Sequence, residues 1–217
     1  MNLEQARYNM IESQIRTWEV LDQTVLDTLF AVKREDYVPE KYRPLAFVDM
    51  EIPLGHGEMM LAPKLEARML QELTLKNTDR VLEIGTGSGY MAALLAALAG
   101  HVFSVELHGD LSEAAAAKLA GHGVNNVTLE VGDAGHGWQR HAPYDVIVLT
   151  GSVPLLPPDF AAQLKPGGRL LAVVGEPPVM TARLVSWMGD GAWNEVGLFE
   201  TCIAPLHNVP QPERFVF

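Results

Sequence analysis

The chain has 217 residues, 48% of them hydrophobic and 20% charged, which is the balance of an ordinary soluble globular protein. This length suits one large domain and is hardly enough for two. A formal net charge of −11 without a Lys/Arg cluster argues against nucleic acid or an anionic membrane surface as a partner. A single cysteine, Cys202, fits a reducing compartment, and we see neither a signal peptide nor a membrane-spanning apolar run. We therefore expect a cytoplasmic protein.

The first eighty residues or so predict a helical cap. Helical spacing of apolar residues predicts a helix over 3–17, and a second helix should begin after Asp22, a good N-cap, and reach Val32. Residues 33–62 are interrupted by proline and glycine, with short extended pieces such as 46–48 expected between them. Pro63 suits the first position of a third helix that continues through Leu73.

Beyond this cap, strands and helices alternate. Strands are expected at 81–84, 102–106, 127–131, 144–149 and 169–174, and helices near 89–99, 110–120 and 157–164. Residues 165–168 should form the turn before the fifth strand, and the segments 180–188 and 193–203 flank a Gly-Asp-Gly hairpin signal. The predicted fold is α/β and doubly wound, with a mostly parallel, Rossmann-like sheet of seven strands that ends in an antiparallel hairpin. We expect one domain, with a cap over 1–78, a sheet over 79–206 and a tail over 207–217.

The first strand of this sheet runs into a glycine-rich loop, Glu83-Ile-Gly-Thr-Gly-Ser-Gly89, followed by a helix. The glycines allow a sharp turn and a close approach to a ligand, and the helix directs its free N–H groups toward that ligand. A dinucleotide fingerprint requires a glycine where Tyr90 stands, and no phosphate-binding Gly-Lys-Ser/Thr is present. The pattern resembles the S-adenosylmethionine loop of class I methyltransferases.

Two further acids follow successive strands. Glu106 ends the second strand, about twenty residues past the loop, where a carboxylate can accept hydrogen bonds from both ribose hydroxyls. The alternative is a solvated acid at a strand end. Asp133 follows the third strand and is placed to bind the adenine amine, or else it forms an Asx turn. Together these signals predict a cofactor site at the carboxyl ends of the strands.

Other chemistries find little support in the sequence. The seven histidines have no metal-binding spacing, and His136 and His141, five apart in an expected loop, are better explained as solvated side chains. No Gly-x-Ser-x-Gly context marks a hydrolase nucleophile. The fourth strand runs into Thr150-Gly-Ser-Val-Pro154 and lacks the Asp/Asn-Pro-Pro-aromatic motif of many methyltransferases that modify bases. We therefore expect no metal and no nucleic-acid acceptor.

Over nearly its whole length the chain resembles the protein-L-isoaspartate O-methyltransferases. The segments that carry the resemblance are 10–16 (MIESQIR), 34–40 (REDYVPE), 49–57 (DMEIPLGHG), 62–63 (AP), 81–90, 164–170 and 203–206. The resemblance implies methyl transfer from S-adenosylmethionine to the side-chain carboxylate of isoaspartyl residues, which begins their repair. It also implies a protein or peptide substrate. Because a carboxylate is already nucleophilic at neutral pH, no general base is required, and we assign no catalytic residue.

The resemblance also implies the site residues. The cofactor-binding set is Glu83, Gly85, Thr86, Gly87, Ser88, Gly89, Glu106, Leu107, Asp133 and Ala134. The candidates on the acceptor side are Asp49, His56, Glu58, Met59 and Leu61.

The chain departs from the family pattern directly after Gly57. The family has Gln-Thr-Ile-Ser-Ala-Pro-His, whereas residues 58–64 read Glu-Met-Met-Leu-Ala-Pro-Lys, so both hydroxyls are replaced by apolar side chains. A site that loses such groups loses discrimination for its substrate. Two alternatives therefore stay open: a paralogue that methylates a more apolar acceptor, and a module that binds the cofactor without isoaspartyl activity. A nicotinamide dehydrogenase is disfavoured by Tyr90.

A second departure is the tail over 207–217, which continues beyond the last strand of the family and ends in Arg-Phe-Val-Phe. We expect its three final apolar residues, Phe215, Val216 and Phe217, to pack against the domain or a partner chain if they are ordered.

Overall fold

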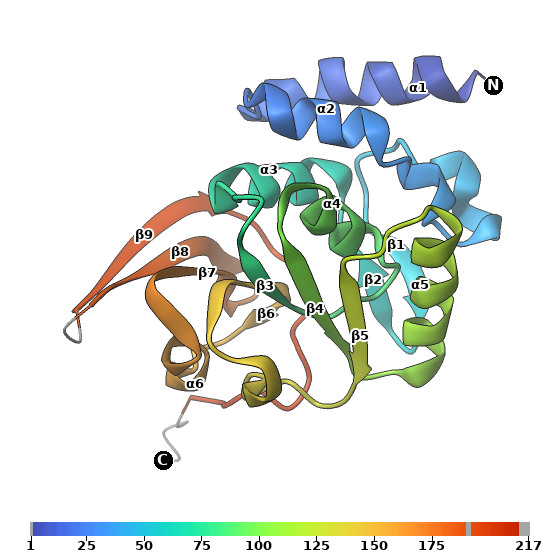
Figure 1. Cartoon of the computed structure of the whole chain (residues 1–217). Helices are drawn as coiled ribbons and strands as arrows, with labels where there is room; N and C mark the ends of the chain where they lie inside the picture. The colour runs from blue at the N-terminus through green and yellow to red at the C-terminus, as the bar shows by residue number, and fades with distance from the viewer. Residues whose placement is uncertain (1, 190–191, 213–217) are drawn as a thin grey trace, which may run out of the picture.

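A computed structural model describes residues 2–189 and 192–212, and its centre is a seven-stranded sheet (Figure 1). The strand order is β5-β4-β3-β6-β7-β8-β9, in which the first four pairings are parallel and the last two antiparallel. The strands are β3 (Arg80–Ile84), β4 (His101–Glu106), β5 (Val127–Val131), β6 (Tyr144–Val153), β7 (Leu164–Glu176), β8 (Val179–Gly189) and β9 (Ala192–Glu200). This order confirms the predicted doubly wound sheet with a terminal hairpin; the hairpin's two turn residues, 190 and 191, lie outside the described part.

The central strands are buried on both faces because helices cover the sheet from both sides. Along β3, Val81 belongs to the core cluster that contains helix α4 (Tyr90–Leu98), whereas its neighbour Leu82 belongs to the cluster on the opposite face. The second cluster also contains Phe160 of the short helix α6 (Pro158–Ala162). Successive side chains of a central strand thus pack alternately into two separate cores, one on each face of the sheet. This arrangement requires the near-continuous apolar runs seen in the sequence.

The N-terminal cap consists of helices α1 (Leu3–Met10), α2 (Gln23–Ala31) and α3 (Pro63–Leu73) and a small hairpin, β1 (Ile52–Gly55) with β2 (Glu58–Met60). The Asp22 carboxylate caps α2 by accepting from the N–H groups of Thr24 and Val25, at 2.8 and 3.2 Å. The α1 path continues as a π-helical and then a 3₁₀ turn as far as Trp18. The prediction of extended backbone at 46–48 was wrong: these residues form turns after a 3₁₀ segment (Glu40–Leu45), and the Val48 N–H bonds to Leu45 O.

Buried arginines hold the cap together. Arg34 is fully buried; it pairs with Glu66 of α3 and donates to the carbonyls of Ala46 and Leu61, at 3.0 and 2.7 Å. Because one guanidinium satisfies all these acceptors, the irregular segment before α3 is fixed in place.

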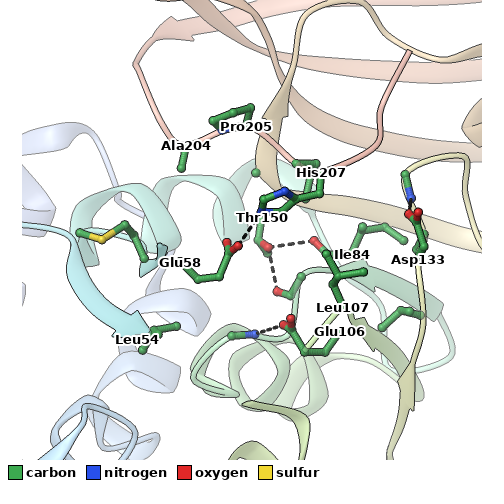
Figure 2. Close-up of a pocket in the computed structure, with 18 of the residues that line it drawn as sticks. Leu54, Glu58, Ile84, Glu106, Leu107, Asp133, Thr150, Ala204, Pro205 and His207 are labelled. Carbon is green, nitrogen blue, oxygen red and sulfur yellow. Dashed lines mark hydrogen bonds and ion pairs between the residues drawn. The ribbon is translucent and has the colours of Figure 1, made fainter. Parts of the chain in front are cut away.

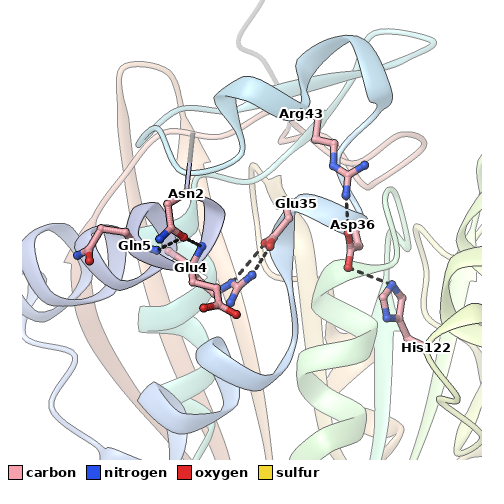
Figure 3. A network of polar contacts seen from close by, with 8 residues as sticks. Asn2, Glu4, Gln5, Glu35, Asp36, Arg43 and His122 are labelled. Atoms are coloured by element: carbon pink, nitrogen blue, oxygen red, sulfur yellow. Dashed lines mark hydrogen bonds and ion pairs between the residues drawn. The ribbon is translucent and has the colours of Figure 1, made fainter.

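The next two residues after Arg34 make one link within the cap and one to the rest of the fold. Glu35 pairs with Arg7 of α1, and Asp36 lies between Arg43 and His122 (Figure 3). Since His122 is the C-cap of helix α5 (Gly109–Gly121), Asp36 links the cap to the helix that follows β4.

Three strand boundaries differ most from the predicted ones. β6 continues to Val153, and β7 begins at Leu164, so residues 165–168 belong to an irregular strand start instead of a separate turn. β9 ends at Glu200, and the chain then returns to the sheet, where Pro205 bridges Ser152. None of the helices in the described ranges is long and apolar enough to cross a membrane.

Candidate functional site

A pocket opens at the carboxyl ends of β3, β4, β5 and β6, the edge at which the sequence predicted a cofactor site (Figure 2). Its walls come from the glycine loop, the residues after β4 and β5, the carboxyl end of β6, the cap hairpin and the segment 204–207. Parallel sheets bind ligands at this edge, next to the strand where the order reverses, and here that strand is β3.

The glycine loop forms the floor of the pocket. Gly85 has φ of +96°, and a Cβ on it would overlap the Thr150 hydroxyl. That hydroxyl donates to the carbonyls of Ile84 and Gly85, at 2.8 and 2.7 Å, and so ties the end of β6 to the loop. Gly89, with φ of +83°, is the N-cap of α4. The loop can take this path only because glycine occupies both positions.

Beneath the loop lies a buried polar network. Glu83 is fully buried and lines no part of the described pocket. Its carboxyl group accepts a hydrogen bond from the Ser104 hydroxyl at 2.5 Å, and the same hydroxyl bonds to the Thr86 hydroxyl at 2.6 Å. Burial raises the pKa of Glu83 to about 8. Glu83 and Thr86 thus support the loop from below, and Ser88 and Thr86 line a smaller cavity beside the main one.

Glu106 lies in the pocket wall at the end of β4. One carboxylate oxygen accepts from the N–H of Gly87 at 2.8 Å and the other from the N–H of His108 at 3.0 Å. These two backbone donors fix the direction of the carboxylate. Its neighbour Leu107 contributes an apolar side chain to the same wall.

Asp133 and Ala134 lie in the wall after β5. The Asp133 carboxylate accepts from the Gly135 N–H at 3.0 Å, which is the Asx turn considered from sequence, and from the Asn208 side chain at 2.7 Å. Asp133 therefore both lines the pocket and forms the turn.

The five acceptor-side candidates divide into two groups. Glu58, Met59 and Leu61 line the pocket. Asp49 and His56 are not part of the lining that the structure describes: Asp49 pairs with Lys64 at 2.7 Å, and exposed His56 bonds to Asp110 at 2.8 Å. The hydrogen bond that the imidazole donates to the Asp110 carboxylate raises the pKa of His56.

Several lining residues were not predicted. Thr150 lies in the last part of β6, at the carboxyl edge of the sheet, so its position in the strand pattern could have identified it. Leu54 comes from the cap hairpin, and Ala204 to His207 come from the segment that follows β9. Nothing in the local sequence places these segments over the pocket, because they reach it only through tertiary packing.

Comparison with known proteins identifies the family. A family model described as protein-L-isoaspartate(D-aspartate) O-methyltransferase matches residues 5–200. The chain belongs to this family. A relative from Methanoculleus marisnigri, named protein-L-isoaspartate O-methyltransferase, is 40% identical over 92% of this chain and 90% of its own length. One of the same name from Protochlamydia amoebophila is 41% identical over 84% of this chain and 87% of its own.

Solved structures agree with the family assignment. A protein-L-isoaspartate O-methyltransferase superposes with a TM-score of 0.79 at 26% identity, over 92% of this chain and 65% of that one. A Plasmodium falciparum structure, titled as a putative enzyme of this kind in complex with S-adenosyl-L-homocysteine, has a TM-score of 0.80 at 19% identity, over 95% and 98% of the two chains. The second likeness concerns the fold alone. The predicted family and methyltransferase fold are thus confirmed.

Proposed function

We propose that this protein transfers a methyl group from S-adenosylmethionine to the side-chain carboxylate of isoaspartyl residues in damaged proteins. The observation that carries the proposal is the position of Glu106 in the pocket wall, held by the N–H groups of Gly87 and His108 beside a glycine floor. Family membership supports the same activity.

The residues present suit S-adenosylmethionine. Glu106 offers carboxylate oxygens for the ribose hydroxyls, and Asp133 with the Ala134 backbone suits the adenine edge. Leu107 supplies an apolar surface, and the loop at Gly85 leaves space that a side chain would fill. When bound, the cofactor supplies an electrophilic methyl group on a sulfonium centre.

The chain's own contribution to the reaction is to bind the cofactor and the acceptor, to orient the acceptor carboxylate and to remove water from around it. The acceptor carboxylate is already ionised at neutral pH, so no side chain has to remove a proton from it. Met59 and Leu61 line the pocket with apolar atoms, which lowers the hydration of whatever enters. Glu58 adds a negative charge to that wall.

The lining also favours a second candidate, a related enzyme with a more apolar acceptor. Its support is specific: in place of the family's two hydroxyl residues the pocket presents Met59 and Leu61. A module that binds the cofactor without turnover is the third alternative.

We further propose, from the composition and charge of the chain, that it is a single-domain, cytoplasmic protein with no nucleic-acid partner.

Methyl transfer from labelled S-adenosylmethionine tests these proposals. The acceptors are an isoaspartyl peptide, its aspartyl counterpart and total cell-lysate protein. Transfer to the isoaspartyl peptide and not to its aspartyl counterpart supports the main proposal. Transfer to lysate components without transfer to that peptide would favour the apolar acceptor, and cofactor binding without any transfer would favour the module.

A further inference from the structure

Three potential metal ligands from distant parts of the chain meet at the mouth of the pocket. They are Glu58 at the start of β2, His108 after β4 and His207 in the C-terminal segment. One ligand atom from each lies within 4.8 Å of the other two. The sequence predicted no metal site, because ligands at positions 58, 108 and 207 have no recognisable spacing.

The contacts within this trio are compact. The Nε2 atom of His207 lies 2.7 Å from Glu58 Oε1, and the Nε2 atom of His108 lies 3.5 Å from the same oxygen. In a tetrahedral zinc site with bonds of 2.0–2.1 Å, ligand atoms lie roughly 3.3 Å apart. The trio therefore needs only small side-chain movements to surround an ion.

One of the three ligand atoms is a buried nitrogen without a hydrogen-bond partner among the described residues. The Nε2 atom of His108 is shielded from solvent and has no hydrogen-bond partner within the described ranges, since its contact with Glu58 lacks hydrogen-bond geometry. The His108 ring is held by stacking on His56, with centroids 4.3 Å apart and planes at 7°, and His56 is anchored by Asp110. A fixed imidazole with a free nitrogen beside a carboxylate is a suitable ligand for a cation.

We propose that Glu58, His108 and His207 form a binding site for a divalent transition-metal ion, with zinc as the best-suited ion. Two imidazoles and one carboxylate are ligands that favour zinc over magnesium or calcium, which take oxygen ligands. Three protein ligands leave a fourth coordination position open. Such an ion would join the cap hairpin, the loop after β4 and the C-terminal segment across the pocket mouth.

The ion would also change the charge that an acceptor meets. Glu58 alone contributes a negative charge to the pocket wall, whereas Glu58 with a divalent ion contributes a net positive charge. An anionic acceptor is then attracted instead of repelled. This consequence for the acceptor rests on the proposed function, whereas binding of the ion does not.

Binding is tested by titrating tag-free protein with Zn²⁺ in a calorimeter and with Co²⁺ by absorption. We expect one ion per chain and the d–d bands of a tetrahedral Co²⁺ site. Glu58→Gln, which keeps the shape of the side chain, and His207→Ala should each weaken binding at least about tenfold. Saturating Zn²⁺ should raise the melting temperature of the wild type by about 5 °C.

Two control variants isolate the trio. His136→Ala removes an exposed histidine that pairs with Asp159 at 3.3 Å, and Cys202→Ser removes the exposed cysteine. Both should bind zinc as the wild type does. Absence of stoichiometric binding, or equal binding by wild type, Glu58→Gln and His207→Ala, would overturn the site.

The effect of the ion on acceptor binding is tested separately, through the KM for the acceptor. With the site intact, Zn²⁺ should lower the KM for an isoaspartyl peptide, and His207→Ala should abolish this effect. An unchanged KM despite proven zinc binding would overturn the consequence. Failure of the proposed function would be distinct from both, because the peptide would then remain unmethylated with and without zinc.

Discussion

The backbone N–H of Gly87 donates to the carboxylate of Glu106 over 2.8 Å, so the floor of the pocket and its acidic wall are joined directly. The two residues lie nineteen positions apart in the chain: Gly87 is in the loop after β3, and Glu106 ends the neighbouring parallel strand β4. This bond orients the carboxylate before any ligand arrives, and preorganisation of this kind reduces the entropic cost of binding.

Replacement of Glu106 by alanine should weaken binding of S-adenosylhomocysteine by about 1.5–3 kcal/mol, because a charge-assisted hydrogen-bonding group is lost from the wall. Isothermal calorimetry measures the change. Glu113→Ala, on the exposed face of α5, is the matched control and should leave the affinity unchanged. An affinity within twofold of wild type for Glu106→Ala would exclude the ribose role.

Gly85→Ala should disrupt the loop. The substitution places a side chain at φ of +96° and drives its Cβ into the Thr150 hydroxyl, so we expect more than about 1 kcal/mol of destabilisation and loss of cofactor binding. Thermal unfolding and calorimetry report the two effects.

Gly109→Ala provides the comparison for this loop variant. Gly109 is the first residue of α5, where an added Cβ has no neighbour within 4 Å among the described residues and φ is not positive. The Gly109→Ala variant should fold and bind the cofactor as the wild type does. If both alanine variants behave alike, the steric account of the loop is wrong.

The sequence predicted those parts of the site that follow from strand order. Glu106 and Asp133 could be placed because one ends a parallel strand and the other follows the next, and the carboxyl ends of parallel strands meet at one edge of the sheet. Glu83 was named as a cofactor residue on motif resemblance, yet it lies buried beneath the loop. Its bonding to Ser104 depends on which face of β3 it occupies, and a motif does not give that information.

Residues supplied by distant segments could not be predicted. His207 reaches the pocket because the chain after β9 returns alongside Ser152, a contact without a local sequence signal. The start of the tail packs in the same way, with Val209 buried in the second core cluster. The expected packing of Phe215, Val216 and Phe217 lies outside the described residues, and the division into cap, sheet and tail stays a prediction.

The buried carboxyl group of Glu83 should make stability depend on pH. Burial raises its pKa from 4.5 to about 8, so the folded state holds a proton that the unfolded state releases above pH 4.5. Its contribution to stability is therefore complete below pH 4.5 and is lost as the pH rises toward 8. The free energy of unfolding should fall in this window by on the order of 1 kcal/mol per pH unit.

Glu83→Gln removes this titration while keeping the shape of the side chain. Urea unfolding at pH 5 and pH 8 measures the difference, and we expect the variant to lose less stability between the two pH values than the wild type. Glu66 also titrates in this window, because burial raises its pKa to about 7, so the pH dependence of the variant should shrink and not vanish. An identical pH profile for both proteins would contradict the assignment to Glu83.

The acceptor segment gives the sharpest test of what this chain methylates. Met59 and Leu61 line the pocket where the family has hydroxyl residues, so an entering carboxylate loses its hydration without gaining these donors. One missing donor of this kind costs on the order of 100-fold in rate, about 2.7 kcal/mol. We therefore expect slow methylation of an isoaspartyl peptide by the wild type, compared with a family member that keeps Thr-Ile-Ser.

The double change Met59→Thr/Leu61→Ser should raise that rate, with an aspartyl peptide as the control acceptor. Arg34 should hold the segment in place in both proteins, because it bonds to the Leu61 carbonyl, which the substitution leaves intact. A gain in rate can then be attributed to the new hydroxyls and not to a moved backbone. If the wild type already turns over at the rate of that family member and the double change adds nothing, other groups orient the acceptor. The backbone N–H groups of the hairpin turn at 55–57 are the donors that would then have to perform this role.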